Sequence, residues 1–202
     1  MTSAGPLLVV VDMQELFHEA ASPWLVPGFD ELTDPIGRLV PAFGDRVVNT
    51  RFVLPAAIDG SWRPYYEAFD AVTRPENAGW FELAGPYRSW AGHVVERSTF
   101  NAWGELRRVA GDPPTIVLCG VATDCCVIST ALPAADAGAS VRVVDDACRG
   151  SSAKAHEAAI SVLAGYAPQI AITTVDAELD LAGAAGRLSP LGGSVAPTTL
   201  TP

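Results

Sequence analysis

The segment TIVLCGVATDCCVIST, residues 115–130, contains an apolar β-branched run, a glycine and two adjacent cysteines. The run TIVLCGV predicts a buried strand, and the polar letters after it predict a turn. From residue 124 the sequence DCCVISTALPAADAG has apolar residues at helical spacing and stops at Gly138, which predicts a helix that Pro133 should kink. A strand, a turn and a helix in this order form the repeating unit of parallel α/β sheets.

Similar β-branched runs recur along the chain, with helical stretches between them that are marked by glycine, proline or serine. They predict about six strands, at residues 7–12, 46–53, 93–98, 115–121, 140–147 and 169–175. Near-continuous apolar strands are typical of strands buried on both faces, and right-handed crossovers place helices over both. The expected fold is therefore a single α/β domain with an open, parallel, six-stranded, doubly wound sheet and helices on both faces.

Composition limits the possible partners. The 202 residues are 49% hydrophobic and 18% charged, enough for one substantial core. The net charge of −10, with Lys154 as the only lysine, argues against binding to nucleic acid or to an anionic membrane. Residues 1–14 have no basic leader, and Asp12 interrupts their apolar run, so we expect neither a signal peptide nor a membrane span and predict a cytoplasmic protein.

Two parts of the chain differ from the strand and helix pattern. Residues 54–92 interleave proline, glycine and aromatic residues, which predicts a long functional loop or lid. Residues 183–202 are rich in glycine, proline, serine and threonine, which predicts a disordered tail after a domain of residues 1–182.

Ligands of open parallel sheets bind beyond the carboxyl ends of the strands. This rule selects Asp12, Arg97 and the loop 120–126, each of which closes or follows a predicted strand. The four cysteines are too few and too closely spaced for a disulfide framework, and their spacing does not match a zinc site. A cysteine after a strand is usually a small core residue, and this is our interpretation of Cys119, Cys148 and Cys125.

Four separated segments carry a resemblance to a known family: LLVVVDMQELF, RSTFNAW, LCGVATDCCVISTALPAADAG and VRVVDDACRGSSAKAHEAAI. In order and spacing they resemble the isochorismatase-like cysteine hydrolases, which include nicotinamidases and N-carbamoylsarcosine amidohydrolases. The resemblance implies a Cys-Asp-Lys triad and a cis peptide bond ahead of the nucleophile. Family members commonly form dimers or tetramers, so a homodimer or homotetramer is expected.

The family pattern implies that Cys126 is the nucleophile and Asp12 the general base, with Cys125 at a variable position. It also implies a cis bond between Val121 and Ala122, where backbone N–H groups, with that of Cys126, would form an oxyanion hole. The family lysine is replaced by Arg97, which keeps the charge. A guanidinium does not release its proton, so Arg97 is expected to act as a fixed charge.

Further expectations concern the substrate and metals. Aromatic residues are numerous around the expected mouth of the site, and Phe17, Trp62 and Trp103 are the preferred substrate contacts. Nicotinamidases of this family have a histidine-containing metal site after the second strand, and the stretch RFVLPAAIDGSWRPYY has no histidine. We therefore expect no metal and no cofactor, and a small molecule as substrate.

Three functions remain open at this point. The first is a cysteine hydrolase that cleaves the C–N bond of a small amide, carbamoyl or ureido compound through a thioester. The second is an isochorismatase-type vinyl-ether hydrolase, which uses acid catalysis by the aspartate and does not need the cysteine. The third is a catalytically silent binding protein, which the replacement of the family lysine by Arg97 suggests.

Overall fold

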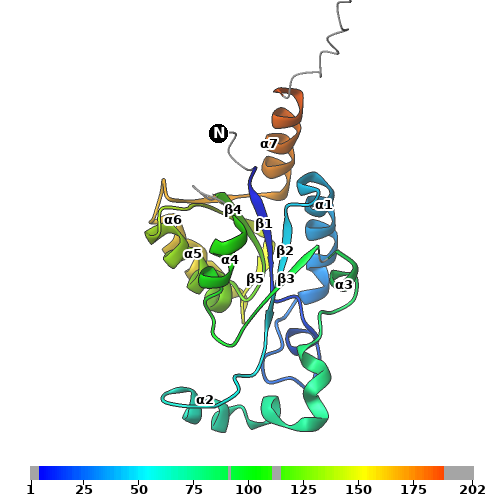
Figure 1. Cartoon of the computed structure of the whole chain (residues 1–202), viewed down its shortest axis with the longest axis vertical. Helices are drawn as coiled ribbons and strands as arrows, with labels where there is room; N and C mark the ends of the chain where they lie inside the picture. Colours follow the sequence, from blue (N-terminus) through cyan, green and yellow to red (C-terminus); the bar gives the residue numbers. More distant parts are fainter. Residues whose placement is uncertain (1–4, 91, 111–114, 189–202) are drawn as a thin grey trace, which may run out of the picture.

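Residues 5–90, 92–110 and 115–188 are described by the computed structural model (Figure 1). Six strands form one parallel sheet in the order β3-β2-β1-β4-β5-β6. The predicted fold class is confirmed, and the observed strand bounds lie close to the predicted ones. The strands are β1 (Leu7–Val11), β2 (Val47–Phe52), β3 (His93–Arg97), β4 (Thr115–Val121), β5 (Ser140–Arg149) and β6 (Ile170–Thr173).

Helices cover both faces of the sheet. Helices α1 and α7 lie together on one face, and α4, α5 and α6 lie on the other (Figure 1). The bounds of the helices are α1 (Thr33–Phe43), α2 (Trp62–Ala68), α3 (Tyr87–Trp90), α4 (Trp103–Ala110), α5 (Ile128–Asp136), α6 (Ala153–Ala164) and α7 (Val175–Leu188). None of the described helices is both long and apolar enough to cross a membrane.

Burial follows the position of each strand in the sheet. All five residues of β1 are buried, and β4 is buried from its second residue onward. The edge strand β3 is more exposed, and only its last residue, Arg97, is buried. The strand order has its reversal between β1 and β4, because the chain moves outward from β1 to β3 and then crosses back to β4. The carboxyl ends of β1 and β4 therefore flank the crevice where such sheets bind ligands.

Two sequence expectations need correction. Residues 54–92 are not a structureless loop: they contain α2, α3 and two 3-10 segments, Asp70–Thr73 and Pro75–Phe81. Their aromatic side chains give these short helices an apolar surface to bury, which a free loop would leave exposed. Helix α7 continues to Leu188, so the first residues of the predicted tail are helical. The rest of that tail, residues 189–202, lies outside the described residues.

Candidate active site

Asp12 follows the last residue of β1, and its side chain is completely buried. Its φ of 51° lies in the left-handed region, which aspartate tolerates better than most residues. Thr50, in the middle of the neighbouring strand β2, fixes this turn from the side. The hydroxyl of Thr50 donates to Oδ1 of Asp12 at 2.5 Å and accepts from the backbone N–H of Asp12 at 3.1 Å.

Arg97 ends β3, two strands away from β1, and its side chain reaches across the end of β2. Its Nη2 donates to Oδ2 of Asp12 in a pair that is almost fully buried. The guanidinium carbon lies 5.6 Å from the centre of the Phe52 ring, within the range of a cation–π contact. The Nε and Nη1 atoms are buried and have no hydrogen-bond partner among the described residues. Arg97 therefore directs its charge to Asp12 and its neighbourhood.

Gly120 allows β4 to approach the end of β1. It has a φ of +105°, and a Cβ placed on it would lie 2.2 Å from the carbonyl oxygen of Val11. Only glycine fits here, because a side chain would clash with the backbone of the paired strand. This close contact places Val11, the residue before Asp12, beside the turn that follows β4.

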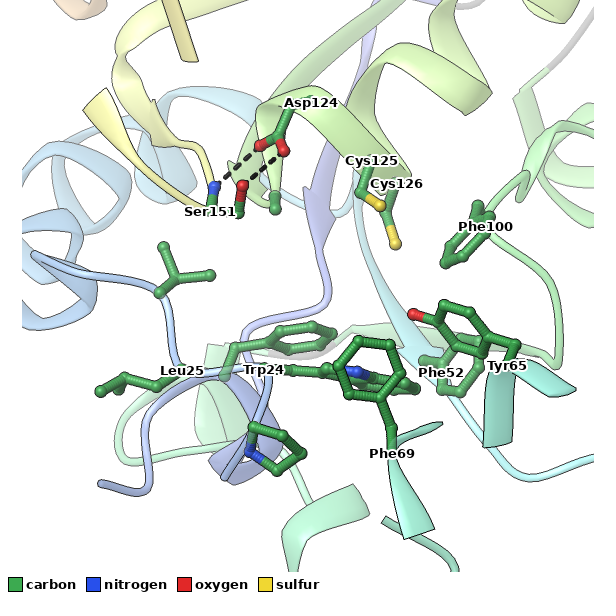
Figure 2. A pocket seen from close by; sticks show the side chains of 14 residues that line it. Trp24, Leu25, Phe52, Tyr65, Phe69, Phe100, Asp124, Cys125, Cys126 and Ser151 are labelled. Carbon is green, nitrogen blue, oxygen red and sulfur yellow. Dashed lines mark hydrogen bonds between the residues drawn. The ribbon is translucent and has the colours of Figure 1, made fainter. Parts of the chain in front are cut away.

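Cys126 lies in a π-helical turn, Thr123–Val127, between β4 and α5. Its residue is 4% exposed, and its sulfur points toward a pocket (Figure 2). Burial raises the pKa of the Cys126 thiol well above its usual range, and the charge of Asp12 raises it further, while Arg97 opposes the shift. Because the two raising effects outweigh the lowering one, Cys126 rests as a neutral thiol with a carboxylate beside it.

The same electrostatics act on Arg97. Burial lowers its pKa, but the negative charge of Asp12 raises it, as a thiolate at Cys126 would, and the net shift is upward. Arg97 thus remains a cation throughout the neutral range. The three predicted residues, Asp12, Arg97 and Cys126, are brought together by the structure from the ends of β1, β3 and β4.

The peptide bond between Val121 and Ala122 is cis. The carbonyl oxygen of Ala122 accepts from the N–H groups of Cys125 at 3.0 Å and Val127 at 3.2 Å. These two N–H groups are therefore engaged within the turn. An oxyanion hole made by the turn with the N–H of Cys126 stays a prediction.

Two neighbouring residues of the turn that contains Cys126 are tied to the β5–α6 connection and to the first turn of α6. Asp124 accepts from the N–H of Ser151 at 2.8 Å and from its hydroxyl at 2.6 Å (Figure 2). Thr123 shares a 2.8 Å hydrogen bond with Nδ1 of His156, whose Nε2 lies 3.0 Å from Asp145. These bonds hold the turn in place against the residues that follow β5.

A cavity of about 280 Å³ opens in front of Cys126. Its wall is mainly apolar and rich in aromatic rings, and its polar lining comes from Asp124, Ser151, the hydroxyl of Tyr65 and the two adjacent cysteines. Figure 2 shows the sulfurs of Cys125 and Cys126 facing the aromatic side. The aromatic residues that line the cavity are Phe17, Trp24, Phe52, Tyr65, Phe69 and Phe100.

Of the three predicted substrate contacts, Phe17 lines the cavity, and Trp62 and Trp103 do not. Trp103 is buried in the first turn of α4. Trp62 packs behind the wall, with its ring 5.4 Å from that of Tyr65 and 5.0 Å from that of Phe100. Trp62 and Tyr65 are three residues apart and lie on the same face of α2, so their rings contact each other, but only Tyr65 reaches the cavity lining.

Sequence reasoning missed Thr50, Trp24 and the pair of Asp124 and Ser151. One feature of the sequence could have indicated Thr50, because a buried polar residue inside an apolar strand needs a hydrogen-bond partner. Trp24 lies in an irregular stretch after β1 that has no pattern of its own. Asp124 belongs to the family motif, but its partner is distant in sequence, and nothing in the chain alone points to Ser151.

The described residues do not fit the metal site of the family's nicotinamidases. Asp59, in the segment after β2, is exposed and pairs with Arg63 at 3.7 Å. Among the described residues, no group of three or more histidine, cysteine, aspartate and glutamate side chains is placed to hold a metal ion.

Comparisons with known proteins agree with the fold. Residues 6–177 match the isochorismatase domain. A cysteine hydrolase from Pseudomonas syringae pv. phaseolicola 1448A is 19% identical, with a TM-score of 0.74 over 92% of this chain and 100% of that one. A pyrazinamidase of Pyrococcus horikoshii, solved in complex with zinc, is 22% identical, with a TM-score of 0.66 over 85% of this chain and 99% of that one.

A nicotinamidase/pyrazinamidase from Bacillus subtilis is 20% identical, with a TM-score of 0.66 over 84% of this chain and 100% of that one. No curated protein sequence matches the chain. At these identities the solved structures support the fold, and the domain match covers most of the sequence. The predicted resemblance is confirmed: the chain belongs to the isochorismatase-like hydrolase family.

Proposed function

We propose that the protein is a cofactor-free cysteine amidohydrolase that cleaves the C–N bond of a small amide through a thioester on Cys126. The observation that supports this most directly is the buried cluster of Asp12, Arg97 and Cys126 at the base of a cavity. A carboxylate beside a neutral thiol can accept the thiol proton as the sulfur attacks a carbonyl carbon.

In the first half of the reaction, the sulfur of Cys126 bonds to the carbonyl carbon and its proton passes to Asp12. Backbone N–H groups at Ala122 and Cys126 stabilise the oxygen that becomes negative. The C–N bond then breaks, and Asp12 returns the proton to the departing ammonia or amine. The product at this stage is a thioester on Cys126.

In the second half, water attacks the thioester carbon and gives a proton to Asp12. The C–S bond breaks, the acid leaves, and the proton returns to the sulfur. Arg97 takes no part in proton transfer, because its guanidinium remains charged. It pairs with the carboxylate of Asp12 and offsets the negative charge that passes between oxygen and sulfur.

The test is ammonia release from a panel of primary amides, ureido acids and lactams, with mass spectrometry of the quenched protein. We expect an acyl adduct on Cys126 that is lost in Cys126→Ala together with turnover. Cys125→Ala is the matched control, because its thiol lines the same cavity, and it should keep both adduct and turnover.

A different outcome would assign another function. Ammonia release by Cys126→Ala with loss in Asp12→Asn would refute the thioester route. Hydrolysis of a vinyl ether, with the same tolerance of Cys126→Ala and the same dependence on Asp12, would indicate the vinyl-ether chemistry of the family. No turnover and no adduct with any compound of the panel would favour a binding protein. We also propose that the protein is cytoplasmic and forms a homodimer or homotetramer. Light scattering on the purified chain tests the proposed assembly.

A further inference from the structure

The wall of the cavity presents aromatic surface from several separate segments. Trp24 comes from the stretch after β1, Phe52 from β2, and Tyr65 from α2, with Phe69 directly after that helix. The ring of Trp24 is inclined by 39° to that of Tyr65 and by 68° to that of Phe69. Rings at such different angles form a concave wall. Figure 2 shows this wall opposite Asp124 and the two cysteines.

Among the described residues that line the cavity, Asp124 is the one with a charged side chain. Both of its oxygens accept hydrogen bonds from Ser151, so the carboxylate is held in place (Figure 2). No lysine, arginine or histidine is among the described lining residues. Arg97 lies outside the lining and is paired with Asp12. The cavity therefore offers a negative charge without a cation to accompany it.

An aromatic wall with a fixed carboxylate suits one chemical class of ligand. The faces of tryptophan, tyrosine and phenylalanine attract cations, most strongly where water is excluded, and alkylammonium groups also bury apolar surface against them. A carboxylate ligand would lie near Asp124 and gain no compensating charge. The net charge of −10 further favours the approach of cations.

We infer that the cavity recognises an amide whose non-reacting end is an alkylammonium cation, held between the aromatic wall and Asp124. This inference rests on the proposed amidohydrolase function, because it places the carboxamide at Cys126. The specificity-determining residues are Trp24 and Asp124. An uncharged apolar amide would use the wall alone, and an anionic amide would be repelled.

Two amides of nearly identical shape test the charge preference. Trimethylammonioacetamide and 3,3-dimethylbutanamide differ in one atom, a charged nitrogen in place of a carbon. We expect kcat/KM to be at least about tenfold higher for the cation. The ratio should fall toward one in Asp124→Asn. Glu67→Gln is the matched control, since it removes one exposed negative charge on α2 outside the cavity and should preserve the ratio.

Binding without turnover separates this inference from the proposed function. In Cys126→Ala, titration calorimetry should detect trimethylammonioacetamide and tetramethylammonium, with weaker binding of 3,3-dimethylbutanamide and of succinamate. Trp24→Leu should weaken the binding of both cations. Cation binding by an unmodified protein that hydrolyses no amide of the panel would leave the cation site standing and refute the amidohydrolase. Equal or tighter binding of the neutral or anionic amide would overturn the inference, whatever the enzyme hydrolyses.

Discussion

Arg97 pairs with Asp12 although their strands, β3 and β1, are not neighbours in the sheet. The strand between them, β2, contributes Thr50, which bonds to the other carboxylate oxygen. Asp12 is thus held by a cation on one oxygen and by a hydroxyl on the other. The arrangement orients a buried carboxylate and leaves its charge compensated, which a carboxylate without solvent requires.

Replacement of Arg97 tests whether this side chain acts only through its positive charge or also through its shape. Arg97→Lys restores the residue typical of the family and retains a cation beside Asp12, so we expect kcat within about tenfold of the unmodified protein. Arg97→Met leaves a buried carboxylate without its partner, and we expect a loss of about 3–5 kcal/mol in the free energy of unfolding. Its kcat should fall at least about 100-fold. Denaturant unfolding and ammonia release measure both effects.

A fully active Arg97→Met protein would show that the guanidinium plays no part in the reaction. A stable but inactive Arg97→Lys protein would show that the shape of the guanidinium matters as well as its charge. Both outcomes contradict the role of a fixed charge proposed above.

Thr50 tests the orientation of the base. Thr50→Val keeps the shape of the side chain but removes the hydroxyl that donates to Oδ1 of Asp12 and accepts from its backbone N–H. A hydrogen bond to a charged group contributes about 1.5–3 kcal/mol, so we expect kcat to fall about 10- to 100-fold with little change in KM. Thr50→Ser keeps the hydroxyl and is the control. Equal kcat in the two variants would rule out this positioning role.

The sequence was sufficient for the sheet and for the three clustered residues, and the reasons are local. Apolar β-branched runs specify buried parallel strands, and the rule for their carboxyl ends places Asp12, Arg97 and the loop 120–126 at one edge. The choice of Cys126 within that loop came from the family pattern. The cavity wall could not be predicted in the same way. Which aromatic side chains face the cavity depends on how residues 54–92 fold into short helices, and these have neither caps nor a clear repeat. Tyr65 and Trp62 therefore could not be told apart beforehand.

Partnerships between distant segments were also beyond the sequence. Asp124 and Ser151 are 27 residues apart, and Thr123 and His156 are 33 apart. Each pair joins the turn after β4 to the start of α6, and their contact depends on Gly150. A Cβ on Gly150 would lie 2.8 Å from Oδ1 of Asp124 and 2.7 Å from the backbone nitrogen of His156. A glycine alone does not reveal which two segments approach it.

Gly120 is expected to be indispensable for the fold. In Gly120→Ala the new Cβ would meet the backbone of Val11, which belongs to the paired strand and cannot move as a side chain could. The positive φ adds a further cost, and we expect a loss of more than about 3 kcal/mol in the free energy of unfolding. Gly104→Ala is the control in α4, where nothing lies within 4 Å, and it should be neutral or stabilising by up to about 1 kcal/mol. Similar melting temperatures for the two variants would contradict the close approach of β4 and β1.

The thiol of Cys126 provides a test of the electrostatics that needs no substrate. Since burial and Asp12 raise its pKa, alkylation of Cys126 should be slow at pH 7 and should accelerate as pH rises above the usual range of a thiol. Asp12→Asn removes a neighbouring negative charge and leaves Arg97 unopposed, so the pKa should fall. Alkylation at pH 7 should then become faster, while hydrolysis becomes slower because the proton acceptor is gone. Fragment-ion sequencing of the peptide that contains both cysteines, after timed exposure to iodoacetamide, distinguishes Cys126 from Cys125. Slower alkylation in Asp12→Asn would contradict this account. It would mean that Asp12 favours the thiolate form of Cys126, so that the reaction would begin from a thiolate paired with a cation and not from a neutral thiol.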